Sequence, residues 1–204
     1  MNKLHIPPLD EQAAKTALEH QKILAKTPLA LGKLEPVAIQ IAAMTGNPAP
    51  RLKDKAVVLF AADHHIADHG LSLTSTDVTY IQTRNFLQGG GTINAFTRNA
   101  GARLSVVDVG VNYDFGDLPG LVKRKVMHGA SDFSRGPAMT REQALECLQV
   151  GIDMAREEKA RGLDIVAAGE MGIGNTTPSS AIVAVLTGTP VETVTGRGSG
   201  VKGE

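Results

Sequence analysis

The chain has 204 residues, of which 42% are hydrophobic and 21% are charged, so it has enough apolar side chains for a core and intrinsic disorder is disfavoured. Its 21 basic and 21 acidic side chains cancel, and it has two Tyr, five Phe and no Trp, which disfavours a nucleic-acid-binding surface. No apolar run is long enough to span a bilayer or to form a signal peptide, and the single Cys147 cannot form an internal disulfide. We therefore expect a cytoplasmic protein that binds neither nucleic acid nor membrane.

The first 50 residues predict a helical appendage. Apolar residues recur near the helical period over residues 10–26. A second helix is expected from Leu34 to Met44, because a Thr-Gly-Asn-Pro turn signal follows at residues 45–48. Since no strand is predicted between these helices, we expect residues 1–50 to form part of a small helical domain, followed by an α/β core over residues 51–204.

From residue 55 onward, the pattern changes to alternating strands and helices. Continuous apolar runs predict buried parallel strands at residues 56–62, 104–109 and 165–168, with a weaker candidate strand at 191–195. The helices expected around them span residues 78–87, 92–100, 140–161 and 177–186. The helix at 140–161 begins with a capping box made by Thr140 and Gln143 and closes at Gly162. This alternation predicts an α/β fold, a Rossmann-like, mostly parallel sheet with helices on both faces.

A polar cluster directly follows the first predicted strand. It contains Asp63, His64, His65, Asp68 and His69. Ligands of parallel sheets bind beyond the carboxyl ends of the strands, so Asp63 and His64 are expected to point toward a ligand. Such a cluster could also hold a divalent metal, and ordinary loop polarity is a third interpretation. We favour a place in a binding site, and we predict no metal and no other cofactor.

A glycine-rich segment, Gly169 to Thr177, follows the strand at 165–168 and opens a helix. Its glycines would let the backbone approach a ligand, and the N–H groups at the helix start would hold a phosphate. The segment lacks the third glycine of the dinucleotide fingerprint and the Gly-Lys-Ser/Thr of a P-loop. A phosphate or ribose site is favoured over the alternative of a tight turn between strand and helix.

Two further segments are weaker candidates. Gly196 to Gly200 could be a second anion-binding loop, or simply a flexible glycine-rich end. Residues 73–77 lead into the helix that carries Gln82, which could line the same ligand site as Asp63; alternatively, Thr76 or Asp77 is simply the N-cap of this helix.

These segments together closely resemble the nicotinate-nucleotide–dimethylbenzimidazole phosphoribosyltransferase family. The order and spacing agree from about Leu31 to the last residue, and the stretch that begins at Glu170 is the most specific part. Shorter strings also match: Val78-Thr79, Asn85-Phe86-Leu87, Gly89-Gly90-Gly91, Val106 to Gly110, Asp132-Phe133 and Gly136 to Thr140. The resemblance implies a pentosyltransferase that moves the 5-phosphoribosyl group of nicotinate mononucleotide to 5,6-dimethylbenzimidazole or a related aromatic base. The product is the α-ribotide used as the lower ligand of cobalamin. The resemblance also implies a homodimer and a small helical domain built from both chain ends.

The same resemblance assigns residues to the two substrates. The phosphoribosyl group is expected at Glu170, Met171, Gly172, Ile173, Gly174, Asn175, Thr176, Gly196 and Gly198. The aromatic base is expected at Asp63, His64, Thr74 and Gln82, with Thr74 in place of a serine. Glu170 is also the candidate for an assisting carboxylate.

One departure from the family pattern concerns the reaction itself. The principal general base of the family, a glutamate in a Gly-Glu-Gly segment, has no counterpart in this chain, which corresponds to the N-terminal three-fifths of a typical member. Glu204 matches no catalytic position, and Lys202 is not in register with the lysine that helps to hold the phosphate. We therefore expect this chain alone to have little or no transferase activity.

Two other functions are compatible with parts of the sequence. Asp63-His64-His65 is the signature triplet of the Asp-His-His metal phosphoesterases, but those enzymes also need acidic motifs on earlier strands, where residues 1–55 predict helices. A non-catalytic module that binds a nucleotide or base is the second alternative.

Overall fold

The structure, a computed structural model, describes residues 5–198. The chain divides into two compact units, Met1–Lys53 and Asp54–Glu204, which are described separately. Among the described residues, no helix is both long and apolar enough to cross a membrane.

The first unit contains the two predicted helices, α1 (Glu11–Ile23) and α2 (Leu34–Thr45). Helix α1 begins at Asp10, whose carboxylate accepts the Ala13 N–H at 2.8 Å, and it ends three residues before the expected position. Helix α2 ends at Gly46, which has a φ of +63° as the turn signal requires. Small alanines on both helices are buried where the helices pack.

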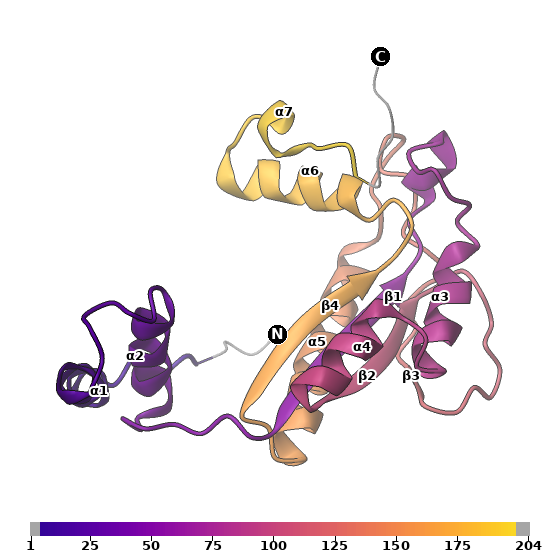
Figure 1. Ribbon diagram of the computed structural model, residues 1–204. Coiled ribbons are helices and arrows are strands. Elements are labelled where there is room, and N and C mark those ends of the chain that lie inside the picture. The colour runs from indigo at the N-terminus through magenta and orange to yellow at the C-terminus, as the bar shows by residue number, and fades with distance from the viewer. Residues whose placement is uncertain (1–4, 199–204) are drawn as a thin grey trace. The chain divides into compact units, whose positions relative to one another are not determined.

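The second unit is built on a four-stranded parallel sheet of order β3-β2-β1-β4 (Figure 1). The strands are β1 (Lys55–Ala62), β2 (Ala102–Gly110), β3 (Leu121–Lys123) and β4 (Ile165–Met171). The predicted parallel sheet is therefore confirmed. Strand β3 was not predicted, because a three-residue segment carries no periodic signal.

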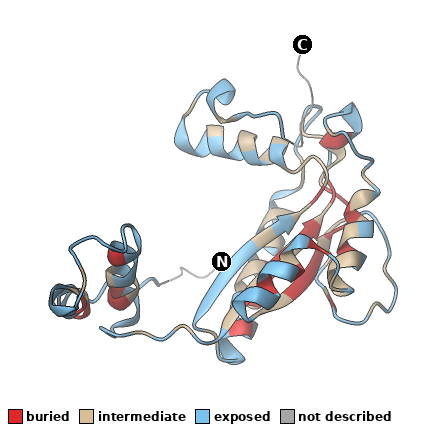
Figure 2. Cartoon of the chain, in the orientation of Figure 1, coloured by how far each residue is buried: buried red, intermediate tan, exposed pale blue. Residues whose placement is uncertain are grey.

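Helices cover both faces of this sheet, as predicted (Figure 1). On one face, Val58 of β1 and Val107 of β2 pack against α5 (Arg141–Ala160). On the other face, the neighbouring residues Leu59 and Val106 pack against side chains of α3 (Val78–Leu87) and α4 (Thr92–Ala100). Alternate residues of one strand point to opposite faces, so β1 and β2 are buried on both sides. Figure 2 shows this burial in the sheet beneath α4. Residues 165–168 of β4 are exposed, so the strand predicted there is confirmed but its predicted burial is wrong.

Helix α5 has the predicted caps and also carries a buried carboxylate. Thr140 and Gln143 exchange the two capping-box hydrogen bonds, and Gly162 has a φ of +82°. Near the end of the helix, the side chain of Glu158 is fully buried. It accepts hydrogen bonds from Arg103 at 3.0 Å, Ser105 at 2.8 Å and Arg161 at 2.8 Å. These bonds fix the last turns of α5 to the beginning of β2.

The weak strand predicted at residues 191–195 is wrong. Residues Val191–Val194 form the short helix α7, which begins after Pro190. The β-branched residues favour a strand locally, but a strand needs a neighbouring strand to pair with. This segment instead folds back on α6 (Thr176–Thr187), where the Ser180 hydroxyl donates to the Val194 carbonyl at 3.1 Å. A short 3-10 helix, η1 (His65–His69), was also not predicted.

Candidate functional site

The strand order creates a switch point, at which the helical connections on the two sides of β1 cross opposite faces of the sheet. From β1, the chain passes through α3 and α4 over one face to β2, and from β3 it passes through α5 over the other face to β4. Since β1 and β4 are parallel neighbours, their carboxyl ends lie at one edge of the sheet. Ligands of doubly wound sheets bind at such a switch point. The Asp63-His64 pair and the Gly172–Asn175 segment both emerge there.

Asp63 connects the end of β1 to two neighbouring loops. Its Oδ2 accepts the Asn112 N–H at 2.7 Å, and its carbonyl accepts the Ala130 N–H at 2.9 Å. The residue is only 7% exposed, and its Oδ1 has no hydrogen-bond partner among the residues that the structure describes. Asp63 and His64 line a polar cavity of about 240 Å³. Buried polar atoms are usually hydrogen-bonded, so this oxygen would accept a hydrogen bond if a donor reached it.

His64 lies between β1 and the glycine segment after β4. Its ring Nε2 would be 3.0 Å from a Cβ built on Gly172, so the imidazole packs directly on that backbone. Burial lowers the pKa of His64 below its ordinary value, and the negative charges of Glu170 and Asp63 oppose this shift without reversing it. We therefore expect a neutral imidazole near pH 7.

The segment after β4 fits closely between its neighbours because it is rich in glycine. A Cβ on Gly172 would overlap the Ala62 carbonyl oxygen. Gly174 has a φ of +80°, and a Cβ there would lie 2.7 Å from the Ala67 Cβ. The Gly172–Asn175 segment thus packs closely against the end of β1 and against η1, and positions 172 and 174 have no room for a side chain.

The side chains around this segment have different environments. Glu170 is exposed, and its carboxylate accepts a hydrogen bond from the Asn175 amide. Met171 instead packs against the core cluster that contains Leu59. Successive strand residues point to opposite faces, so Glu170 is open to a ligand while the Met171 side chain contributes to the core.

The structure brings the second glycine segment next to the first. A Cβ built on Gly198 would lie 3.1 Å from the Thr176 Oγ1, in the first turn of α6. Gly196 is exposed and follows helix α7, not a strand. Ser199, Gly200, Lys202 and Glu204 lie outside the described residues. The start of α6 is therefore flanked by both segments that the sequence predicted as anion loops.

The residues predicted for the aromatic base do not all meet. Gln82 lies on α3, where its Oε1 accepts the Asn85 amide N–H at 3.0 Å, and it lines a different cavity from that of Asp63 and His64. Thr74 is exposed and forms a hydrogen bond with Ser72 in the loop before α3, and it lines neither of these two cavities.

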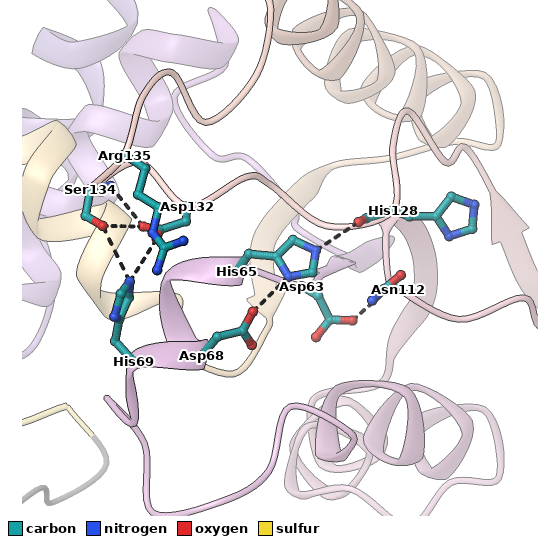
Figure 3. A network of polar contacts seen from close by, with 9 residues as sticks. All are labelled: Asp63, His65, Asp68, His69, Asn112, His128, Asp132, Ser134 and Arg135. Atoms are coloured by element: carbon teal, nitrogen blue, oxygen red, sulfur yellow. Dashed lines mark hydrogen bonds and ion pairs between the residues drawn. The ribbon is translucent and has the colours of Figure 1, made fainter.

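A second polar network, which the sequence did not reveal, joins η1 to the loop at residues 128–135 (Figure 3). His69 Nε2 lies 2.8 Å from the Asp132 Oδ2, and the Ser134 hydroxyl donates to the Asp132 Oδ1 at 2.7 Å. His65 contacts the Asp68 carboxylate at 3.1 Å. His65 and His69 are thus held by acidic partners and do not simply face solvent. No group of three or more His, Cys, Asp or Glu in the described part of the chain could hold a metal ion.

This network gives a testable titration. Hydrogen bonds from Ser134, and then from His69, lower the pKa of Asp132 from 3.8 to about 2. Because the folded-state pKa is depressed, the stabilisation by Asp132 is present above pH 3.8 and is lost as the pH falls toward 2. We expect NMR of the carboxyl carbon to show titration near pH 2 in the native chain and at a higher pH in Ser134→Ala. An Asp132 midpoint that is unchanged by Ser134→Ala would contradict this assignment.

Aromatic side chains gather beside the Asp63 cavity. Tyr80 of α3 stacks on Tyr113 with ring centroids 4.5 Å apart, and Tyr113 meets Phe115 edge to face at 5.2 Å. Tyr113 directly follows Asn112, which Asp63 holds. Asp63 therefore also positions the loop that supplies one ring of the stack. No sequence pattern predicts this contact, because Tyr80 lies in the connection between β1 and β2, whereas Tyr113 lies in the connection between β2 and β3.

The parallel sheet and its switch point define a Rossmann-like α/β protein that carries two glycine-rich segments beside α6. The chain matches a family model described as phosphoribosyltransferase over residues 6–204. It is 52% identical over 174 residues to a nicotinate-nucleotide–dimethylbenzimidazole phosphoribosyltransferase of Geobacter sulfurreducens, covering 85% of this chain and 49% of the relative. The chain belongs to the nicotinate-nucleotide–dimethylbenzimidazole phosphoribosyltransferase family.

Other relatives give the same result. A protein of this name from Chloroflexus aggregans is 48% identical over 197 residues, covering 97% of this chain and 56% of the relative. The crystal structure of CobT from Thermus thermophilus matches with a TM-score of 0.90 at 44% identity, covering 94% of this chain and 57% of that one. The chain thus spans about half the length of the curated relatives that it matches. The comparisons support this family and not the Asp-His-His phosphoesterase alternative.

Proposed function

We propose that this chain carries the nucleotide-binding part of an enzyme that transfers the 5-phosphoribosyl group of nicotinate mononucleotide to 5,6-dimethylbenzimidazole or a related aromatic base. The products are an α-ribotide and nicotinate. Family membership supports this reaction, which the relatives' names describe. The observation that carries the proposal is that Gly172–Asn175 leads directly into α6 while Gly198 lies close to Thr176 in its first turn.

The phosphate would bind at the first turn of α6. Backbone N–H groups at a helix start attract an anion, and the glycine segments allow close approach without side-chain clash. Thr176 and Asn175 would add polar side-chain contacts, and Glu170 would lie near the ribose. The Met171 contribution would be limited to its backbone, because its side chain packs in the core.

The base would bind beside the ribose, on the His64 side of the segment. A ring nitrogen must attack the anomeric carbon while the other ring nitrogen loses its proton, and fixed contacts must align the two reactants. The Oδ1 of Asp63 and the neutral His64 are acceptors at this edge of the sheet. Thr74 and Gln82 would line the outer part of the base site.

Calorimetric titration tests the nucleotide site. We expect nicotinate mononucleotide to bind the folded chain with one-to-one stoichiometry and nicotinate riboside, which lacks the phosphate, to bind at least about tenfold more weakly, since charge-assisted hydrogen bonds are lost. Equal affinity for both ligands, or binding of neither, would contradict a phosphate site at α6. Pro190→Ala, in the turn before α7 and outside the proposed contacts, is the control and should bind normally.

The wider assembly is also part of this proposal. We propose that residues 1–50 belong to a small helical domain, separate from the α/β core over residues 51–204. We further propose that the protein acts in the cytoplasm as a homodimer and does not bind nucleic acid. The balanced charge of 21 basic and 21 acidic side chains supports the last statement.

A further inference from the structure

We infer that Thr79 is a positioning residue, whose hydroxyl fixes the Gly172–Asn175 segment against helix α3. The inference rests on the proposed function, because it assigns Thr79 a role in shaping the phosphoribosyl site. Thr79 lies in the first turn of α3 and is fully buried. It therefore touches neither substrate and would act only through the backbone that it holds.

The central contact is one hydrogen bond across the site. The Ile173 N–H donates to the Thr79 Oγ1 at 3.1 Å, although the two residues are 94 positions apart in the chain. Ile173 lies between Gly172 and Gly174, at the middle of the segment that is proposed to contact the phosphoribosyl group. Leaving this N–H without an acceptor at a partly buried position would favour movement of the segment toward water.

The other sides of the segment show why this bond matters. The end of β1 limits Gly172 on one side, and Ala67 of η1 limits Gly174. These contacts are steric and only prevent the segment from moving closer. The bond from Thr79 is attractive and directional, so it also prevents the segment from moving away.

The same bond links the two halves of the proposed site. Helix α3 carries Gln82, three residues after Thr79, and these positions are neighbours on the helix surface. The Thr79 carbonyl also accepts the Thr83 hydroxyl at 2.8 Å, but this bond stays within α3 and does not reach the glycine segment. A displacement of the nucleotide segment would therefore change its position relative to the helix that carries Gln82.

The test compares three substitutions in the full chain. Thr79→Val keeps the size of the side chain but removes the hydroxyl, and Thr79→Ser keeps the hydroxyl. Thr83→Val is the matched control, because Thr83 is also fully buried on α3, but its hydroxyl bonds only within the helix. The measurements are the hydrogen-exchange rate of the Ile173 amide by NMR and the Kd for nicotinate mononucleotide.

We expect Thr79→Val to accelerate exchange of the Ile173 amide at least about tenfold and to raise the Kd about tenfold, as loss of one hydrogen bond implies. Thr79→Ser should restore both values, and Thr83→Val should leave both near those of the unsubstituted chain. An unchanged Kd in Thr79→Val, or equal effects of Thr79→Val and Thr83→Val, would overturn the inference.

Two further results separate this inference from the proposed function. If the unsubstituted chain binds no nicotinate mononucleotide, the proposed function fails, and amide exchange alone decides whether Thr79 holds the segment. If Thr79→Val does not fold, the Ile173 amide of the unsubstituted chain decides the question. Rapid exchange of that amide, at the rate of an exposed loop, would overturn the inference, and protection with normal nucleotide binding in Thr79→Ser would support it.

Discussion

Replacing Gly172 with alanine is expected to weaken binding of nicotinate mononucleotide by between about 10-fold and 100-fold, the equivalent of one or two charge-assisted hydrogen bonds. The added Cβ would overlap the Ala62 carbonyl oxygen and would also meet the His64 ring at 3.0 Å. The carbonyl belongs to a central strand that cannot move without breaking its pairing, so the glycine segment must shift. The N–H groups that follow it would then lose their alignment with the phosphate.

Gly169→Ala is the matched control for this substitution. Gly169 lies in β4, three residues before Gly172, and its Cβ would be 3.3 Å from the terminal methyl of Leu59, which is a flexible side chain. We expect near-normal nucleotide binding and a small loss of stability. Calorimetry measures the affinity, and circular dichroism confirms that both variants are folded. Normal affinity in a folded Gly172→Ala would show that the close packing at this position is not needed for binding.

Replacing Glu158 with alanine is expected to lower the free energy of unfolding by about 2–4 kcal/mol, near the lower end of the cost of breaking a buried ion pair. Ser105 would lose its acceptor in a buried position, whereas the side chains of Arg103 and Arg161 are 30% and 57% exposed and can reach water. Urea denaturation followed by circular dichroism measures this change.

The neighbouring Glu157 supplies the control, since it forms an exposed ion pair with Arg124. Glu157→Ala should cost less than about 1 kcal/mol. Equal effects of the two substitutions would show that the buried network contributes no more than a surface pair.

Glu158 should also make stability depend on pH. Burial raises the pKa of its carboxyl, but the hydrogen bonds from Ser105 and Arg103 and the charges of Arg161 and Arg103 outweigh burial, so the net shift is below the ordinary 4.5. With a depressed folded-state pKa, the contribution of Glu158 is present above pH 4.5 and is lost as the pH falls below it. The stability difference between the native chain and Glu158→Ala should therefore shrink in acid.

The elements that could be predicted from sequence are those with a local cause. The apolar run of β1 and the capping box at Thr140 act on neighbouring residues, and both occur where the pattern indicates. Strand β3 was missed because Leu121–Lys123 forms a strand only through pairing with β2. Residues 191–195 were misassigned because local β propensity competes with packing on α6, and packing prevails.

The site was predictable in its segments but not in its contacts. The positions of Asp63, His64 and the glycine segment follow from a simple rule about the carboxyl ends of parallel strands. The bond from Asn112 to Asp63, and that from Ile173 to Thr79, join residues 49 and 94 positions apart. Only the complete topology brings such partners together. The same applies to the Tyr80–Tyr113 stack, for which neither residue carries any local signal.

The position of β1 at the centre of the sheet has a consequence for how the chain folds. One edge of β1 pairs with β2, and the other edge pairs with β4. Asp54, just before β1, donates its N–H to the carboxylate of Asp164, just before β4, although the two residues are 110 positions apart. During synthesis, β1 would therefore have an open, strongly apolar edge until more than a hundred further residues have been made. Pairings between distant segments form slowly, and an open edge favours association with other chains. Newly made chains should accordingly be most prone to aggregate before β4 is complete.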